Sequence, residues 1–255
     1  MDSPASLFDL TGRVAVVTGG SRGLGRAMVL AMAAAGADVV IASRKEQACL
    51  DLADEVRAST GRDALGLGLH AGQWDAIEPF VDAVYDHFGH LDVLVNNAGM
   101  SPVYGELGDV SEALMDKVLD VNLKGPFRLT ALVGPRMAAD RGGSIVNISS
   151  AAAMAGHPRP HQLPYAAAKA GLNALTVGFA HAYGPTVRVN SIVAGTFLTD
   201  ISKSWDMEAF ARRAETFASG RAGEPDEIVG AALFLASAAS SYTTGSLLTV
   251  DGGQP

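Results

Sequence analysis

The stretch Val14-Ala-Val-Val-Thr-Gly-Gly-Ser-Arg-Gly-Leu-Gly25 decides the fold. Its apolar start predicts a buried strand, its glycines predict a tight turn, and the apolar run from Arg26 predicts a helix. Glycines let the backbone approach a pyrophosphate closely, and free N–H groups at a helix N-terminus can then bind it. From Gly19 the spacing is G-x3-G-x-G rather than G-x-G-x-x-G, and the Lys-Ser/Thr pair of a nucleotide-triphosphatase loop is missing. The stretch therefore predicts a strand, turn and helix that bind a dinucleotide.

Short β-rich runs recur along the chain and alternate with helical patterns. The runs are Val14–Val17, Val39–Ala42, Val93–Val95, Ile145–Ile148, Val187–Val193 and Leu247–Val250, with a weaker, glycine-diluted run at Ala64–Leu69. Apolar residues at three- and four-residue spacing predict a helix over Trp74–Phe88, and prolines predict helix starts at Pro164 and at Glu224-Pro225-Asp226. This alternation predicts an α/β fold, a doubly wound parallel sheet of about seven strands with helices on both faces.

The composition excludes several classes of protein. The chain has 255 residues, of which 48% are hydrophobic and 18% charged, and its 19 basic and 27 acidic residues give a net charge of −8. Such a chain is too apolar to be disordered and too acidic for a typical nucleic-acid binder. Its longest apolar run, Ala27–Ala35, is too short to cross a bilayer, which needs about 20 residues. Met1–Leu10 lacks the apolar segment of a signal peptide. The single cysteine, Cys49, cannot form an internal disulfide, so we expect a reducing, cytoplasmic location.

We expect residues 1–255 to form one domain, because no linker, repeat or low-complexity tract divides the chain. The stretch 196–220 breaks the alternation of strands and helices, and it carries Trp205, Met207, Phe210 and Phe217. We interpret it as a helical excursion over the sheet edge. It is either a substrate lid or an ordinary pair of surface helices.

The end of the second predicted strand bears on the choice of cofactor. Arg44 lies 19 residues after Gly25, where an acidic residue would bind the ribose 2′-hydroxyl of NAD. A guanidinium there suits the 2′-phosphate of NADP, and Arg22 and Ser43 can add a cation and a hydroxyl. We therefore predict NADP(H), with NAD(H) as the alternative if Arg44 and its neighbour Lys45 are only a solvated strand end.

A tyrosine and a lysine on one predicted helix are candidates for acid–base chemistry. Tyr165 and Lys169 are four residues apart and so lie on one face. A tyrosine is a weak base at neutral pH, but a nearby ammonium favours its phenolate form and lowers its pKa. Ser149 and Ser150 end the Ile145–Ile148 strand, at the edge of the sheet where the reactive crevice of an open α/β sheet lies. One of these serines can bind the reacting oxygen.

With these motifs the sequence resembles a single-domain short-chain dehydrogenase/reductase from Leu10 to Gly253. The residues that carry the resemblance are Thr18-Gly19-x3-Gly23-x-Gly25, Asn96-Asn97-Ala98-Gly99, Asn122 in Val121-Asn122-Leu123, Ser150, Tyr165-x3-Lys169 and Asp251-Gly252-Gly253. The resemblance implies a Rossmann-type fold. It also implies hydride transfer between NADP(H) and a secondary alcohol or ketone as a small-molecule substrate.

The resemblance assigns four catalytic roles. Tyr165 is expected to be the general acid/base, and Ser150, rather than Ser149, to polarise the substrate oxygen. Lys169 is expected to bind the nicotinamide ribose and to lower the pKa of Tyr165. Asn122 is expected to anchor a water that links Lys169 to solvent.

The resemblance also implies cofactor-binding residues and an assembly. The cofactor-binding residues are Gly19, Ser21, Arg22, Gly23, Leu24, Gly25, Ser43, Arg44, Asn97, Gly99, Tyr165, Lys169, Phe197 and Thr199. Phe197 and Thr199 are expected beside the nicotinamide carboxamide. A homotetramer, or a homodimer, is expected through the helices around Ser111–Ala138 and Pro164–Tyr183. No cluster of His, Cys and acidic residues has metal-site spacing, so we expect no metal.

Three departures from the family pattern stand out. His70-Ala71 replaces the acid and aliphatic residue that flank the adenine in the family. Ala194-Gly195 replaces a Pro-Gly and removes a rigid turn. The gap between Ser150 and Tyr165 is a residue or two long, with the extra length in the loop 156–164.

The sequence allows two interpretations for several side chains. His157, Arg159 and His161 can recognise an anionic or polyhydroxylated substrate, or they can belong to a proline-stiffened loop at a subunit edge, which we favour. Tyr104, Trp205 and Met207 can line a pocket or simply pack. As a whole, the chain can also be a catalytically silent dinucleotide-binding sensor or scaffold, although such a protein has no need of Asn122, Ser150, Tyr165 and Lys169 together.

Overall fold

The seven strands of the described residues form one parallel sheet. The computed structural model describes residues 4–154, 159–199, 208, 212 and 214–255. The strand order is β3-β2-β1-β4-β5-β6-β7, so the predicted α/β sheet is confirmed. The strands are β1 (Val14–Thr18), β2 (Asp38–Ser43), β3 (Ala64–Gly68), β4 (Val93–Asn96), β5 (Gly143–Ser150), β6 (Val187–Ala194) and β7 (Leu247–Val250).

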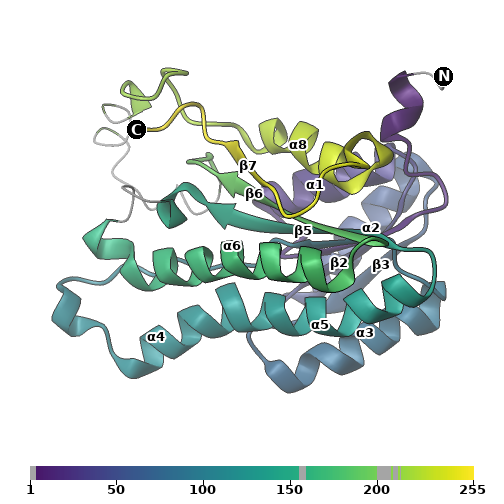
Figure 1. Ribbon diagram of the computed structural model, residues 1–255, viewed down its shortest axis with the longest axis horizontal. Coiled ribbons are helices and arrows are strands. Elements are labelled where there is room, and N and C mark those ends of the chain that lie inside the picture. The colour runs from purple at the N-terminus through teal and green to yellow at the C-terminus, as the bar shows by residue number, and fades with distance from the viewer. Residues whose placement is uncertain (1–3, 155–158, 200–207, 209–211, 213) are drawn as a thin grey trace.

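Helices cover both faces of the sheet (Figure 1). The helices are α1 (Gly23–Ala34), α2 (Glu46–Thr60), α3 (Trp74–Phe88), α4 (Glu112–Leu119), α5 (Gly125–Ala139), α6 (Leu163–Tyr183) and α8 (Val229–Ala236). On one face, α1, α2 and α8 pack their apolar side chains against the sheet. On the other face, α3, α5 and α6 do the same. This double cover explains why β1 is buried at every position and reads as an unbroken apolar run.

The connections place a crevice at the carboxyl ends of β1 and β4. The chain order reverses between these neighbouring strands, because β2 and β3 lie on one side of β1 while β5 to β7 lie beyond β4. Ligands of open α/β sheets bind at such a switch point. The predicted strand ends at Thr18, Asn96 and Ser150 therefore meet at one edge of the sheet.

A π-helical segment joins α4 to α5 and was not predicted. It spans Asp120–Lys124 and lies between two α-helical parts of what the sequence presents as one long helix. The Asn122 Nδ2 donates to the Val118 carbonyl oxygen at 2.9 Å, which is the acceptor that the backbone N–H of residue 122 would use in an α-helix. π-turns of this kind occur often at functional sites.

Element boundaries differ in detail from the sequence-based expectations. α1 begins at Gly23 rather than Arg26, and Glu224 opens a 3-10 turn, Pro225–Ile228, that leads into α8. Pro164 lies in the first turn of α6, as predicted. Trp205, Met207 and Phe210 of the expected lid lie outside the described residues.

Both described ends of the 196–220 excursion are anchored to the body of the protein. A β-bridge joins Phe197 to Gly223, and the side chains of Phe197 and Phe217 are buried. The interpretation of the middle of this excursion as a lid stays a prediction.

Candidate active site

The turn after β1 is shaped as a cradle for phosphate. Gly19 and Gly23 adopt the left-handed backbone region, with φ of 64° and 52°, which favours glycine. A Cβ on Gly25 would lie 2.2 Å from the Gly19 carbonyl oxygen, so only glycine lets α1 start this close to the turn. Arg22 precedes the helix, and its side chain does not cap the helix. The first N–H groups of α1 are therefore available to an anion, as a bound pyrophosphate requires.

Asn97 locks the cradle to the end of β4. Its Nδ2 donates to the carbonyl oxygens of Thr18 and Gly19, at 2.9 and 3.2 Å. The Thr18 Oγ1 in turn accepts from the backbone N–H groups of Asn97 and Ala98, at 3.0 and 3.1 Å. The Asn97 amide thus positions the switch point, and its expected contact with a cofactor stays a prediction.

Cations without a partner gather beside this cradle. Most arginines of the described residues pair with a carboxylate, as Arg26 does with Glu55. Within those residues, the exposed side chains of Arg22, Arg44 and Lys45 make no ion pair or hydrogen bond. Since the protein as a whole is acidic, this local excess of positive charge favours an anionic ligand at the ends of β1 and β2.

The hydroxyls of Ser21 and Ser43 connect the cradle to the end of β2. The Ser21 Oγ donates to the Ser43 Oγ at 2.9 Å, and Ser43 is the residue directly before Arg44. Free helix N–H groups, two hydroxyls and three unpaired cations together fit the phosphates of a nicotinamide dinucleotide.

Ser150, Tyr165 and Lys169 meet where β5 ends and α6 begins. The Lys169 side chain is only 2% exposed. Its Nζ donates to the Ile148 carbonyl oxygen at 2.7 Å and lies 5.8 Å from the centre of the Tyr165 ring. The Ser150 Oγ accepts from the Ala152 N–H at 3.2 Å and hydrogen-bonds with Tyr165. The predicted acid–base pair and its partner hydroxyl are therefore brought together.

Ser149 points the other way from Ser150. Its Oγ is buried and donates to the Lys169 carbonyl oxygen at 3.3 Å, which ties β5 to the backbone of α6. This contact agrees with a structural role for Ser149. Side chains alternate along a strand, so Ser150 faces the crevice.

Burial controls the protonation of the pair. It raises the pKa of Tyr165, and the hydrogen bond with Ser150 only partly opposes this effect. Burial also lowers the pKa of Lys169 to about 8. In this structure burial outweighs the expected lowering of the Tyr165 pKa by Lys169, which stays a prediction. A buried phenolate is costly, and the Lys169 ammonium donates to a backbone carbonyl rather than to the phenol.

Asn122 faces Lys169 across Gly99. The Asn122 side chain is fully buried, donates to the Met100 carbonyl oxygen at 2.8 Å and accepts from the Met100 N–H at 3.1 Å. A Cβ on Gly99 would lie 3.0 Å from the Asn122 Oδ1 and 3.6 Å from the Lys169 Nζ. The missing side chain at Gly99 leaves room between these polar atoms, which is compatible with the predicted water.

Comparison with known proteins decides the family. The family model described as enoyl-(acyl carrier protein) reductase matches residues 19–254. L-rhamnose 1-dehydrogenase (NAD(P)(+)) of Azotobacter vinelandii is 39% identical over 252 residues, which are 96% of this chain and 97% of that protein. The chain belongs to the short-chain dehydrogenase/reductase family. It is therefore an oxidoreductase of that family.

Two further relatives agree with this assignment. Dehydrogenase/reductase SDR family member 4 of Pongo abelii is 37% identical over 249 residues, which are 96% of this chain and 88% of that protein. The crystal structure of a gluconate 5-dehydrogenase from Burkholderia cenocepacia, in complex with NADP and tartrate, has a TM-score of 0.93 and 33% identity. The match covers 99% of this chain and 98% of that one.

The short-chain dehydrogenase/reductase site departs from its family pattern after β3. The His70 Nδ1 accepts from the Gly72 N–H at 3.2 Å, so the imidazole caps the turn. Ala71 is buried, and its carbonyl oxygen would lie 2.0 Å from a Cβ on Gly125. This contact packs the β3–α3 loop against the start of α5.

Phe197 and Thr199, which were expected beside the nicotinamide, have different surroundings after β6. The Phe197 side chain belongs to the apolar core and packs against Gly223, so it can present only its backbone to the crevice. Thr199 lies over the phosphate cradle, because a Cβ on Gly23 would be 3.5 Å from the Thr199 Cβ. Thr199 is therefore placed to cover a ligand bound at the cradle.

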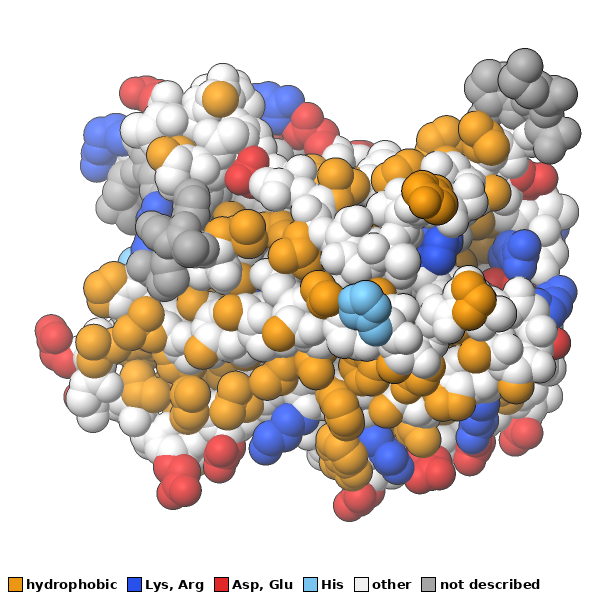
Figure 2. Space-filling model, in the orientation of Figure 1, with side chains coloured by type: hydrophobic (Ala, Val, Ile, Leu, Met, Phe, Trp, Pro, Cys, Tyr) orange, Lys and Arg blue, Asp and Glu red, His pale blue; other side chains and the backbone are white. Residues whose placement is uncertain are grey.

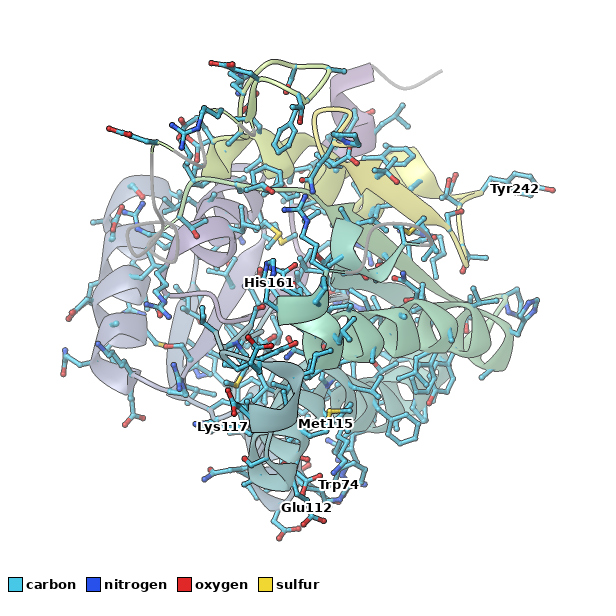
Figure 3. The ribbon with its side chains drawn as sticks, turned by 90° about the vertical axis from the view of Figure 1, so that its left-hand side faces the viewer. Trp74, Glu112, Met115, Lys117, His161 and Tyr242 are labelled. Atoms are coloured by element: carbon cyan, nitrogen blue, oxygen red, sulfur yellow. The ribbon has the colours of Figure 1, made fainter. Side chains whose placement is uncertain are left out.

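Tyr104 pins the loop in front of α6, a role that the sequence left open. Its hydroxyl donates to the Pro160 carbonyl oxygen at 2.6 Å and accepts from the Leu163 N–H at 3.0 Å. His161 is exposed in the same loop, and Figure 3 shows it at the carboxyl edge ahead of α6, above Met115 and Lys117 of α4. His157 lies outside the described residues.

The described portion of the chain contains no helix that is long and apolar enough to cross a membrane. In the same portion, no three His, Cys, Asp or Glu side chains come together as a metal site.

Proposed function

We propose that this short-chain dehydrogenase/reductase interconverts a secondary alcohol and a ketone with NADP(H). The observation that carries the proposal is the meeting of Ser150, Tyr165, Lys169 and Asn122 beside the phosphate cradle. A sensor that only bound the dinucleotide would have no need of these four groups in one place.

The cradle residues are proposed to hold the cofactor. The N–H groups of α1 bind the pyrophosphate, Ser43, Arg22 and Arg44 bind the 2′-phosphate, and Lys169 binds the nicotinamide ribose. The bound nicotinamide supplies or accepts the hydride. The chain positions the reactants and handles the proton.

In the reducing direction, Tyr165 donates its phenolic proton to the carbonyl oxygen of the substrate, while the Ser150 hydroxyl binds that oxygen and stabilises its developing charge. The Lys169 ammonium stabilises the phenolate that remains. Asn122 holds the backbone at Met100 and faces the gap through which Lys169 regains protons from water. In the oxidising direction Tyr165 is the base.

Tyr165 keeps its proton at neutral pH, because its ordinary pKa of 10 lies well above 7 and burial raises it further. A protonated phenol can act as the acid of ketone reduction, whereas alcohol oxidation needs the phenolate. We propose that Tyr165 acts as this acid near pH 7.

Polyhydroxylated substrates are the first to test. One relative is named for L-rhamnose, and one structural neighbour is a gluconate 5-dehydrogenase with bound tartrate. Arg159 is half-buried and makes no ion pair with a described residue, which suits an acidic substrate. We propose that sugars, sugar acids and small ketones belong in one substrate panel.

The panel is assayed by nicotinamide absorbance with NADPH and NADH, in the wild type and in Arg44→Ala. We expect turnover with NADPH, and an Arg44→Ala variant that loses about tenfold or more in NADPH affinity and little for NADH. An equal loss for both cofactors would contradict the 2′-phosphate assignment and favour the NAD-dependent alternative. Tight binding of NADPH without turnover of any carbonyl or alcohol would favour the sensor.

We also propose a cytoplasmic homotetramer, with a dimer as the alternative. Apolar side chains gather over α4, α5 and α6 in Figure 2. Phe127 of α5 and Leu163 and Val177 of α6 are 39%, 39% and 41% exposed. A hollow of about 320 Å³ lies on the same face, lined by Trp74, Leu123, Lys124, Phe127, Gly171 and Leu175. Exposed apolar side chains gathered on one face often form a protein–protein interface. Cys49 is buried and unpaired, in keeping with a reducing compartment.

A further inference from the structure

Cys49 lies directly beneath the end of β2, and the catalytic chemistry does not use it. It is the chain's single cysteine, is fully buried on α2, and places its Sγ 3.0 Å from the Ser43 Oγ. Burial raises the pKa of the Cys49 thiol, so the thiol keeps its proton at neutral pH. A buried S–H group is therefore available as a hydrogen-bond donor.

Either group of the Cys49–Ser43 contact can donate, and we assign the buried thiol as the donor. A serine hydroxyl has one proton to donate and two lone pairs that accept. The Ser21 Oγ donates to the Ser43 Oγ, and Ser43 is the side-chain partner that the described residues offer to the thiol proton. If both groups donate to Ser43, its lone pairs are filled and its own proton is left over.

With the Cys49 thiol as the donor, that remaining proton has only a weak acceptor among the described residues. This acceptor is the Lys45 carbonyl oxygen at 3.4 Å, beyond the usual distance for an O–H donor. Ser43 is followed by Arg44 and Lys45, whose cationic groups pair with no described residue. A ligand anion held by these cations is the better acceptor, and a hydrogen bond to an anion is about twice as strong as a neutral one.

We propose that Cys49 is a positioning residue for cofactor choice, which holds the Ser43 hydroxyl so that its proton faces the 2′-phosphate of NADP(H). The inference rests on the proposed NADP(H) function and deepens it. Cys49 touches no ligand itself and acts through Ser43. NAD(H) carries a neutral hydroxyl at this place and gains little from the same arrangement.

Two substitutions separate the hydrogen bond from simple packing. Cys49→Val keeps an apolar side chain in the space but removes the donor, whereas Cys49→Ser keeps a donor. Binding is measured without turnover, from NADPH and NADH fluorescence and by calorimetry with 2′,5′-adenosine bisphosphate and adenosine 5′-monophosphate. Melting temperatures monitor folding, and Cys49→Ala replaces the valine variant if valine is too large for the site.

We expect Cys49→Val to weaken the binding of NADPH and of the 2′,5′-bisphosphate about three- to tenfold. Affinity for NADH and the monophosphate should stay within about twofold, and Cys49→Ser should restore the affinity for NADPH. Equal weakening of NADPH and NADH, or a serine variant that behaves like the valine variant, would overturn the inference.

Arg44→Ala, measured in parallel, separates this inference from the proposed function. If Arg44→Ala weakens NADPH binding and Cys49→Val does not, only the role of Cys49 is wrong. If neither variant changes the preference between NADPH and NADH, the 2′-phosphate site itself is wrong, and Cys49 has no role in cofactor choice.

Discussion

At the scale of single residues, burial decides the chemistry of the pair on α6. Tyr165 and Lys169 are placed by one turn of helix, but their pKa values respond to the surrounding protein rather than to their spacing. Burial raises the pKa of Tyr165 and lowers that of Lys169 to about 8. The cofactor-free site therefore holds a protonated phenol beside a lysine that loses its charge just above neutral pH.

A pH profile of ketone reduction tests this account. Below pH 8 both Tyr165 and Lys169 carry their protons, so kcat/KM for reduction should be flat from about pH 6 to 7.5. Above a pKa of about 8, Lys169 loses its charge and no longer stabilises the phenolate, so the rate should fall. Alcohol oxidation, which needs the phenolate beside a charged Lys169, should rise with pH up to about 8 and then level off.

Lys169→Arg is the matched variant for the pH profile. A guanidinium stays charged throughout this range, so the fall near pH 8 should disappear even if the plateau is lower. A reduction rate that rises with pH, or an unchanged inflection in Lys169→Arg, would exclude Lys169 as the titrating group.

At the scale of elements, the π-helical segment Asp120–Lys124 connects two parts of the site through hydrogen bonds of Asn122. Asn122 makes three hydrogen bonds, to Val118 and to both backbone groups of Met100. These contacts join the α4–α5 helix to the segment after β4, which carries Gly99. The gap between Asn122 and Lys169 depends on this junction.

Removing the Asn122 amide should therefore affect both stability and catalysis. Asn122→Ala leaves buried backbone groups unpaired and should lower the free energy of unfolding by about 2–4 kcal/mol, together with kcat. Ser111→Ala is the matched control, because the exposed Ser111 caps the start of α4 and accepts from the Leu114 N–H at 3.2 Å. It should cost about 1 kcal/mol and leave kcat unchanged. Urea unfolding and kcat of both variants check this, and equal effects on kcat would remove the special role of Asn122.

The sheet and much of the site could be predicted because each corresponds to a local pattern of residues in the sequence. Unbroken apolar runs such as Val14–Val17 are typical of buried parallel strands. Tyr165 and Lys169 share a helix face because residues four positions apart always do in an α-helix. The π-helical segment and the contact of Tyr104 with the loop before α6 have no such local pattern, because each depends on residues that are distant in the chain. The effect of burial, which raises the pKa of Tyr165, could not be predicted from the sequence either, because burial is a property of the packed protein.

At the scale of the whole molecule, the many apolar side chains of the chain lie in two places. One is the sheet, which is covered on both faces by α1, α2 and α8 and by α3, α5 and α6. The other is the outer face of α4, α5 and α6, where large apolar side chains remain exposed. We infer that this face is covered by a second copy of the chain.

Light scattering after size-exclusion chromatography measures the assembly directly. We expect a mass four times the 26.2 kDa of the chain, or twice that value for the dimer. Phe127→Glu buries a charge in the proposed interface and should shift the mass to smaller species. Leu50→Glu, at an equally exposed leucine on α2, should leave the mass unchanged. A wild-type monomer would contradict the proposed assembly.

The rate of ketone reduction by Tyr165→Phe is the most direct test of the central claim, that Tyr165 protonates the substrate beside a bound NADP(H). The variant keeps the ring and its packing and removes the hydroxyl that carries the phenolic proton. With the best ketone of the panel, kcat should fall by about 10²–10⁴-fold while the affinity for NADPH stays within about twofold. Ketone reduction that survives in Tyr165→Phe at close to the wild-type rate would contradict the account.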